Sequence, residues 1–276
     1  MLISNKVSGE TEAKAILKGA LRRNHQFGDQ LMQTKAARMG IQKARSMKVV
    51  NRIFNEELNW YGDFLVGYKY FKKYGIGTTK HFKAEFTAIE PELTSVEGMG
   101  ELCRFILGAF DSRKVAQCRL HGNCKLASRF YFHEHFLIRC IHRLNFTTIG
   151  DIAVEIYPVI EWLILNNIPL RRLPETNYFV FKNFIVVAEK LSHSQGLVFK
   201  TILLKDRLTD RDNEKFIKAL AIHNDLDKNV AAVQVNAYGD IVCQIPPASG
   251  KSLLNSLSEK SHWVQGIFDA PEINII

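Results

Sequence analysis

The stretch from Phe130 to Gly150, preceded by Arg129, places the tightest single constraint on how this chain folds. At 100° per residue, its cationic and apolar side chains separate onto two sides of a helix. The polar side carries His135, Arg139, His142 and Arg143, and the apolar side carries Phe136, Leu137, Cys140, Ile141 and Leu144. The stretch therefore predicts an amphipathic helix that buries its apolar side.

The polar side of this helix holds two imidazoles and two guanidiniums and no carboxylate. A solvated helix face ordinarily alternates Glu with Lys at i, i+4, which stabilises the helix. Cations that are not neutralised within their own helix favour an anionic ligand. The alternative is that the arginines pair with carboxylates from other elements, for which Glu155, Glu189 and Asp206 are candidates.

Composition bounds the class of protein. A chain of 276 residues with 46% hydrophobic residues can bury a sizeable core in one or two domains. Its net charge of +9 suits a polyanionic partner, and we expect RNA or another nucleic acid. The N-terminus has no apolar signal-like stretch and no apolar run is long enough to span a bilayer, so we expect a cytoplasmic protein. Five cysteines do not indicate a disulfide framework.

The first 50 residues hold ten basic and three acidic residues. Apolar spacing predicts a helix over Glu10 to Arg23 and a second from about Gln30 to Glu57. These helices are interpreted either as a solvated basic hairpin or as an arm lying along phosphates. The candidate nucleic-acid-binding residues are Lys14, Lys18, Arg22, Arg23, Lys35, Arg38, Lys43 and Arg45.

An aromatic segment from Trp60 to Gly75 follows. Trp60, Phe64, Tyr68 and Phe71 have the spacing of a buried helical face, although aromatic residues interleaved with lysines also suit base stacking. A short strand is predicted from about residue 81 and a helix over Gly98 to Phe110. Residues 1–115 are therefore predicted to form a basic, mainly helical domain.

The second half combines both periodicities. A helix bent at Pro158 is predicted over Asp151 to Asn166. Two β-branched and aromatic runs, 178–190 and 196–206, predict an antiparallel hairpin. A charged helix over 207–230 and two strands around a turn at 236–240 complete the pattern. The predicted fold class is α+β, an N-terminal helical domain followed by a small antiparallel sheet packed against helices, divided into 1–115, a candidate catalytic domain at 125–248 and an extension at 249–276.

The connection between the halves contains Cys118, His121 and Cys124 in a C-x-x-H-x-x-C spacing. Thiolates and imidazoles are the ligands that zinc binds tetrahedrally, so this turn is an alternative zinc site that takes its fourth ligand from elsewhere. Because no second ligand pair accompanies it, we expect no cofactor and no metal site, and the zinc turn stays an alternative.

One pattern in the chain resembles a known group of proteins. It consists of His135-x-x-x-Arg139-x-x-x-Arg143, then Thr147 and Thr148, then a hairpin whose second strand carries Lys200 and Thr201. This pattern resembles small bacterial helix-plus-hairpin domains that are similar to the barnase, endoU, colicin and RelE group of ribonucleases. The resemblance spans about residues 129–206. It departs in having Phe136 after the histidine and an additional apolar helix before the first strand.

The resemblance implies a metal-independent endoribonuclease that cleaves RNA by 2′-hydroxyl transesterification. It also implies a toxin with a cognate antitoxin or immunity protein as partner. His135 would act as base or acid with His142 or His133 as its counterpart, Arg139, Arg143 and Lys200 would stabilise the phosphate, and Thr201 would orient it.

Two other functions stay open. One is a non-catalytic nucleic-acid-binding protein, and the other is an interaction or scaffold protein with a structural zinc turn. Because strand side chains alternate, Lys200 and Thr201 face the helix together only if a β-bulge interrupts the strand.

Overall fold

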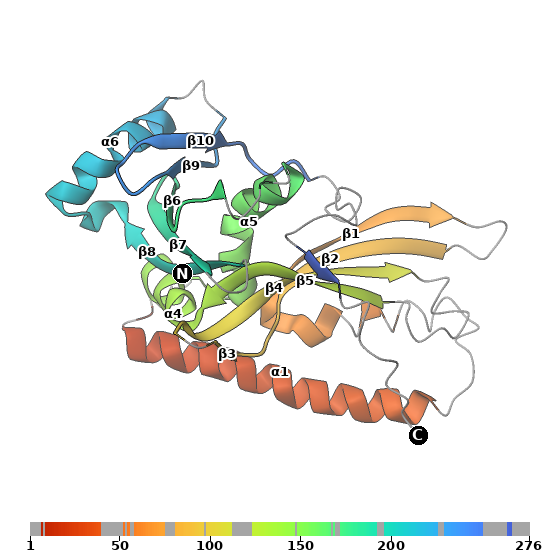
Figure 1. Cartoon of the computed structure of the whole chain (residues 1–276). Coiled ribbons are helices and arrows are strands. Elements are labelled where there is room, and N and C mark those ends of the chain that lie inside the picture. Colours follow the sequence, from red (N-terminus) through yellow and green to blue (C-terminus); the bar gives the residue numbers. More distant parts are fainter. Residues whose placement is uncertain are drawn as a thin grey trace, which may run out of the picture.

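A computed structural model describes residues 7, 9–39, 52, 54–55, 58–74, 81–96, 98–111, 123–146, 148–166, 168, 172–191, 196–225, 229–250 and 264–266. These residues form an α+β protein in which one mixed sheet of 11 strands packs against helices (Figure 1). Within them, we find no helix whose length and hydrophobicity would let it span a bilayer.

The sheet runs in the order β1-β2-β4-β5-β8-β7-β6-β9-β10, with β3 paired to β4 and β11 to β5. Its strands are β1 (Leu65–Tyr74), β2 (His81–Ile89), β3 (Thr94–Val96), β4 (Gly100–Asp111), β5 (Asn123–His133), β6 (Thr176–Val180), β7 (Phe184–Leu191), β8 (Gly196–Leu204), β9 (Ala232–Val235), β10 (Ile241–Ile245) and β11 (Val264–Gly266). Every described pairing is antiparallel except that of β5 with β8, which is parallel. That pair brings the two halves of the chain together.

The helices are α1 (Glu10–Met39), α4 (Glu134–Leu144), α5 (Ile149–Leu165) and α6 (Asp210–Asn224), with 3-10 turns η1 (Gly62–Phe64) and η3 (Lys205–Arg207). Two of them begin at threonines whose side chains cap the helix. Thr148 and Asp151 form a capping box at α5, and Thr209 accepts from the Asp212 N–H at α6.

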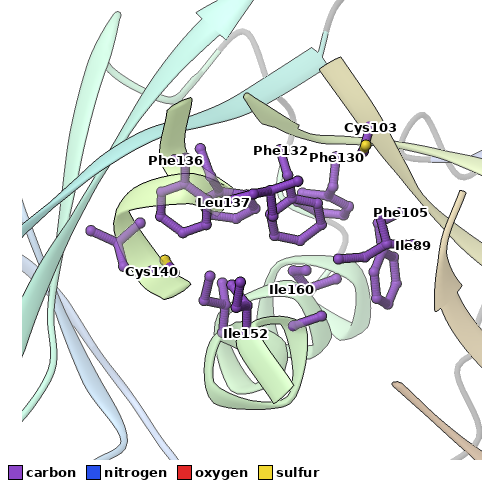
Figure 2. Packing of buried hydrophobic residues seen from close by; sticks show 14 of the residues in the cluster. Ile89, Cys103, Phe105, Phe130, Phe132, Phe136, Leu137, Cys140, Ile152 and Ile160 are labelled. Atoms are coloured by element: carbon purple, nitrogen blue, oxygen red, sulfur yellow. The ribbon is translucent and has the colours of Figure 1, made fainter. Parts of the chain in front are cut away.

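The main core lies where α4 and α5 meet the centre of the sheet. Phe136, Leu137 and Cys140 of α4 pack in one buried cluster with Ile152 and Ile160 of α5, and side chains of the strands lie beside them (Figure 2). In the same cluster the ring of Phe199 lies 5.2 Å from that of Phe132 and 6.2 Å from that of Phe136. This aromatic cluster holds α4 against β5 and β8, and so fixes where the polar side of α4 points.

Several predicted elements are confirmed. The described residues place α4, α5, α6 and the 236–240 hairpin where the periodicities predict them, and the Glu10–Arg23 helix forms the first part of α1. The predicted second helix is continuous with the first as far as Met39, while residues 40–51 lie outside the described part.

The prediction of a helix over the aromatic segment is wrong, because most of it forms η1 and strand β1. Phe54, Leu58 and Tyr61 precede that strand and form a second cluster with Phe82 and Phe86 of β2. Aromatic residues favour strands when they pack across a ladder, and this preference overrides the apparent helical spacing.

The predicted helix at Gly98 to Phe110 is also wrong, since these residues form β4. Leu102 and Cys103 belong to different buried clusters, and Phe105, Ile106 and Leu107 are all buried. A strand covered on both faces loses its period-2 pattern, and short apolar runs of this kind are indistinguishable from buried helix by periodicity.

The sheet is therefore large and mixed rather than small and antiparallel, and the first 115 residues are not mainly helical because they contribute β1 to β4. The run 178–190 is also two strands, β6 and β7, joined by a turn at 181–183. β4 pairs with β5 across the predicted domain boundary. The division into 1–115, 125–248 and 249–276 stays a prediction.

Candidate functional site

The junction of β5 and α4 holds the first predicted site residue, His133. Its Nδ1 accepts the backbone N–H of His135 at 3.0 Å, so the imidazole is the N-cap of α4. Burial lowers the pKa of His133, helped by Lys200 and His135 and opposed by a hydrogen bond to the Met99 backbone. The ring is thus held neutral, with both nitrogens engaged, in a structural position.

The polar side of α4 reaches β8 through its two arginines. Arg139 Nη1 donates to Thr201 Oγ1, and Arg143 Nη1 donates to the Ile202 carbonyl at 2.9 Å. The structure therefore brings together Arg139, Arg143 and Thr201, three of the predicted site residues. The remaining guanidinium nitrogens decide what else this surface can bind.

A β-bulge sets the direction of the β8 side chains. In the pairing with β7, Ala188 lies opposite Phe199 and Val187 lies opposite Thr201, which leaves Lys200 as an extra residue. Two residues of β8 then face one residue of β7, and a bulge of this kind re-aims side chains. Strand side chains alternate, so Lys200 and Thr201 need such a bulge to face the same side of β8.

Lys200 is nevertheless turned toward neighbours other than α4. Its Nζ lies 3.5 Å from Glu189 Oε2 and 3.6 Å from Met99 Sδ. Glu189, one of the carboxylates expected as a neutralising partner, therefore pairs with the lysine rather than with an arginine. Lys200 contributes positive potential beside His133, and Glu189 is its nearest carboxylate.

The arginines form a cluster of like charges. The pKa of Arg143 is lowered by burial, then by Arg139 and further by Arg207 of η3. Glu10, at the start of α1, opposes this shift, and its Oε1 lies 3.9 Å from Arg139 Nε. That separation is too long for a hydrogen bond, and the Glu10 side chain is 52% exposed, so water screens the pair, although Glu10 acts on the pKa of Arg143 more strongly than Arg207 does.

The other two histidines of α4 differ in their surroundings. Burial lowers the pKa of His135, with Arg139 as the next cause, so its ring is neutral at pH 7. The Nδ1 of His142 and the Nε of Arg139 are both buried, and neither has a hydrogen-bond partner among the described residues. His133 and His135 have ring centroids 6.5 Å apart, whereas His142 lies about two turns further along α4.

The basic residues of α1 are only partly described. Lys14, Lys18 and Arg22 are exposed, while Arg23 donates to Asp63 at 2.7 Å. Lys35 and Arg38 lie on α1, but their side chains are outside the described part, as are Lys43 and Arg45. Cys118 and His121 also lie outside it, and Cys124 is described only as a residue of β5. Within the described residues, no group of three or more metal-ligating side chains gathers.

Three neighbours of the site are absent from the sequence prediction: Glu10, Met99 and Arg207. Arg207 is the last residue of η3, which follows β8, so its closeness in sequence to Thr201 offered a signal. Glu10 and Met99 approach only through the tertiary fold, and no local pattern marks them.

Comparison of the chain with known protein families, with curated proteins and with solved structures finds no match.

Proposed function

We propose that this chain binds RNA and that a backbone phosphate lies on the polar side of α4 beside Thr201. The observation that carries the proposal is the pair of guanidiniums that Arg139 and Arg143 hold against β8 through Thr201 and the Ile202 carbonyl. Burial lowers the pKa of Arg143, Arg139 and Arg207 lower it further, and the nearby Glu10 carboxylate is half exposed and lies 3.9 Å from Arg139 Nε. A phosphate that accepts from their free N–H groups relieves this repulsion, and guanidinium geometry suits it.

A row of cations leads away from this position. Lys14, Lys18 and Arg22 follow Glu10 at successive i+4 steps along α1, are exposed, and span about 12 Å. α1 packs against α4 through buried residues that include Ala13 and Leu17. A row of that length accommodates further phosphates of the same strand, and this supports a polymeric ligand over a single small anion.

Cleavage of the bound RNA is a second candidate function, and His135 is the observation that favours it. A neutral imidazole next to a phosphate site can take the 2′-hydroxyl proton. The 2′-oxygen then bonds to phosphorus, the bond to the 5′-oxygen breaks, and the leaving oxygen takes a proton from water or from His142. The products are a 2′,3′-cyclic phosphate and a 5′-hydroxyl.

Binding ranks ahead of cleavage because of His133. As the cap of α4 its ring nitrogens are both engaged, so it is a poor counterpart for His135 in acid–base chemistry. The roles of toxin and of antitoxin or immunity partner, and the resemblance to the barnase, endoU, colicin and RelE group, stay predictions.

The binding proposal is tested by fluorescence anisotropy with a labelled single-stranded RNA over a range of salt concentrations. The double variant Arg139→Gln and Arg143→Gln should bind at least about tenfold more weakly and reduce the salt slope by roughly two. The double variant Lys182→Gln and Lys218→Gln is the matched control, since it also removes two exposed positive charges and neither residue lies on α1 or α4. Equal losses in both proteins would show that the α4 surface has no special part in binding.

The cleavage candidate is tested by incubating the same RNA with the chain in EDTA and identifying the product ends. We expect a 2′,3′-cyclic phosphate from the native chain, and intact RNA from His135→Gln with affinity unchanged within about twofold. RNA that the native chain binds but leaves intact would restrict the function to binding.

A further inference from the structure

A pocket of about 260 Å³ lies between α5 and the turn that joins β6 to β7. Val154, Glu155 and Pro158 line it from α5, and residues 181–184 line it from the turn and the start of β7. Ala231, just before β9, completes the lining. The volume lies just below the about 300 Å³ at which pockets begin to hold drug-sized ligands, so it suits a single small ring system.

The turn side of the pocket combines aromatic carbon with N–H donors. The rings of Phe181 and Phe184 stack with their centroids 4.7 Å apart, and the Phe181 N–H donates to the Phe184 carbonyl at 2.9 Å. This bond closes the turn and holds the two rings in place. Lys182 and Asn183 lie between them, are exposed, and carry side-chain N–H donors.

The α5 side offers acceptors instead. Because Pro158 has no N–H, the Val154 carbonyl lacks the donor that an α-helix ordinarily supplies from four residues further on. Glu155 is an exposed carboxylate that forms no ion pair with another residue in the described part of the chain, although the sequence made it a candidate partner for the α4 arginines. Two acceptors on one side suit an amino group, which carries two N–H donors.

A short link joins this pocket to the proposed phosphate position. The Lys205 N–H donates to the Asn183 carbonyl at 3.2 Å, which ties the turn to η3. Burial lowers the pKa of Arg143, Arg139 lowers it further, and Arg207 at the end of η3 adds to the shift. η3 therefore contacts the pocket turn at one end and lies near Arg143 at the other.

The pocket and the phosphate position also lie on the same face of the sheet. Phe181 and Phe184 belong to the buried cluster that holds α4 and α5. Phe184 pairs with Leu204 of β8, two residues after Ile202, whose carbonyl accepts from Arg143. A nucleotide next to the bound phosphate therefore reaches the pocket without crossing the sheet.

We propose that this pocket binds one base of the RNA strand and selects a base with an exocyclic amino group, cytosine or adenine. The inference rests on the proposed function, because the phosphate held on α4 brings the base to the pocket. The amino group donates to Glu155 and to the Val154 carbonyl, and Asn183 donates to the ring nitrogen beside it. Uracil has a carbonyl oxygen in place of the amino group, and the carboxylate repels it.

Fluorescence anisotropy with labelled oligo(C) and oligo(U) of equal length tests this selection. The two strands carry the same charge and differ only in the amino or carbonyl group of each base and in the ring nitrogen beside it. The contribution of the phosphates is therefore the same in both. We expect the native chain to bind oligo(C) at least about fivefold more tightly than oligo(U).

Two variants locate the site. A glutamine amide also donates to the uracil carbonyl, so Glu155→Gln should reduce the preference for oligo(C) to less than about twofold, mainly by strengthening oligo(U) binding. Ala231→Leu places carbon in the pocket and should weaken oligo(C) binding about fivefold. Glu214→Gln, which removes an exposed carboxylate from α6, is the charge control and should keep the native preference. Lys182→Gln leaves an N–H donor on the turn and should also keep it.

The outcomes separate this inference from the proposed function. Equal affinity of the native chain for oligo(C) and oligo(U) would overturn the inference and leave RNA binding standing. An unchanged preference in Glu155→Gln, shown to be folded by circular dichroism, would overturn it as well. Binding of neither strand would overturn both proposals. If Ala231→Leu fails to fold, Glu155→Gln alone decides the outcome.

Discussion

Helices α4 and α5 follow each other along the chain and pack into the same core, yet they carry opposite charges. On α4 the charged side chains beyond Glu134 of the first turn are Arg139 and Arg143, and both bond to β8. On α5 the notable polar groups are carboxylates, Asp151 in the capping box and Glu161 in the interior.

Most of these charges suit the helix dipole. Arg143 lies in the last turn of α4, and Asp151 lies in the first turn of α5, where the dipole stabilises them. Arg139 in the middle of α4 and Glu161 late in α5 have no such explanation. The comparison teaches that the charges worth testing for function are those that neither a cap nor a dipole accounts for.

The largest expected effect on stability comes from removing the packing that holds α4 against the sheet. Phe199→Ala should lower the free energy of unfolding by about 3–5 kcal/mol, because its ring packs against Phe130, Phe132 and Phe136. Urea unfolding followed by circular dichroism measures the loss. A change below about 1 kcal/mol would mean that α4 is held by something other than this aromatic cluster.

A smaller effect is expected at the α5 capping box. Thr148→Ala should lower the free energy of unfolding by about 1 kcal/mol, since the Asp151 N–H loses its acceptor. RNA affinity should stay the same, because α5 carries none of the cation cluster. Thr209→Ala at the cap of α6 is the matched control and should cost a similar amount. A tenfold loss of RNA affinity in Thr148→Ala would break the separation between the two helices.

The charge contrast itself is sharpened by Glu10→Gln. Removing the carboxylate nearest Arg139 should strengthen RNA binding about two- to fivefold, the range expected for an exposed ion pair. Glu12→Gln, two residues further along α1, is the control for net charge. Anisotropy titrations at one salt concentration suffice, and equal gains in both variants would reduce the effect to general electrostatics.

The smallest effect concerns pH. Because the pKa of His135 is lowered from 6.5, mainly by burial and next by Arg139, the unfolded chain binds a proton there before the folded chain does. The stabilising contribution is present above pH 6.5 and is lost as the pH falls from there through the lower folded value. In urea unfolding at about pH 7.5 and about pH 5.5, the native chain should lose more stability than His135→Gln. An identical pH dependence in both would show that His135 titrates normally.

How much of this fold the sequence predicts depends on whether a helix or strand has one buried face and one exposed face. The prediction of α4 succeeds because its Phe136 side is buried while its Arg139 side is partly exposed. The apolar residues therefore recur with the helical period of 3.6 residues. In β4, Leu102 and Cys103 are buried on opposite faces, and no period survives. The helix prediction for the aromatic segment is wrong for a related reason. Tyr68 of β1 packs against Phe54, which lies outside the strand.

The residues of the candidate site also divide into those that the sequence predicts and those that it does not. Its residues on α4 share one helix and are found by spacing alone. The bulge at Lys200 is not predictable, because a one-residue shift in register depends on how β7 and β8 align rather than on either sequence. Glu10 reaches Arg139 only because α1 packs across α4, which no local pattern encodes.

The parallel contact between β5 and β8 has a consequence for biosynthesis. One edge of β5 pairs with β8 at Phe130 to Phe132 and with β11 at Leu126 to Ser128. During translation this edge emerges from the ribosome before two helices and several strands that precede its partners, and it stays open to wrong pairing meanwhile. Slower elongation after β5 should therefore favour aggregation of nascent chains, and chaperones that shield strand edges should have their largest effect in that interval.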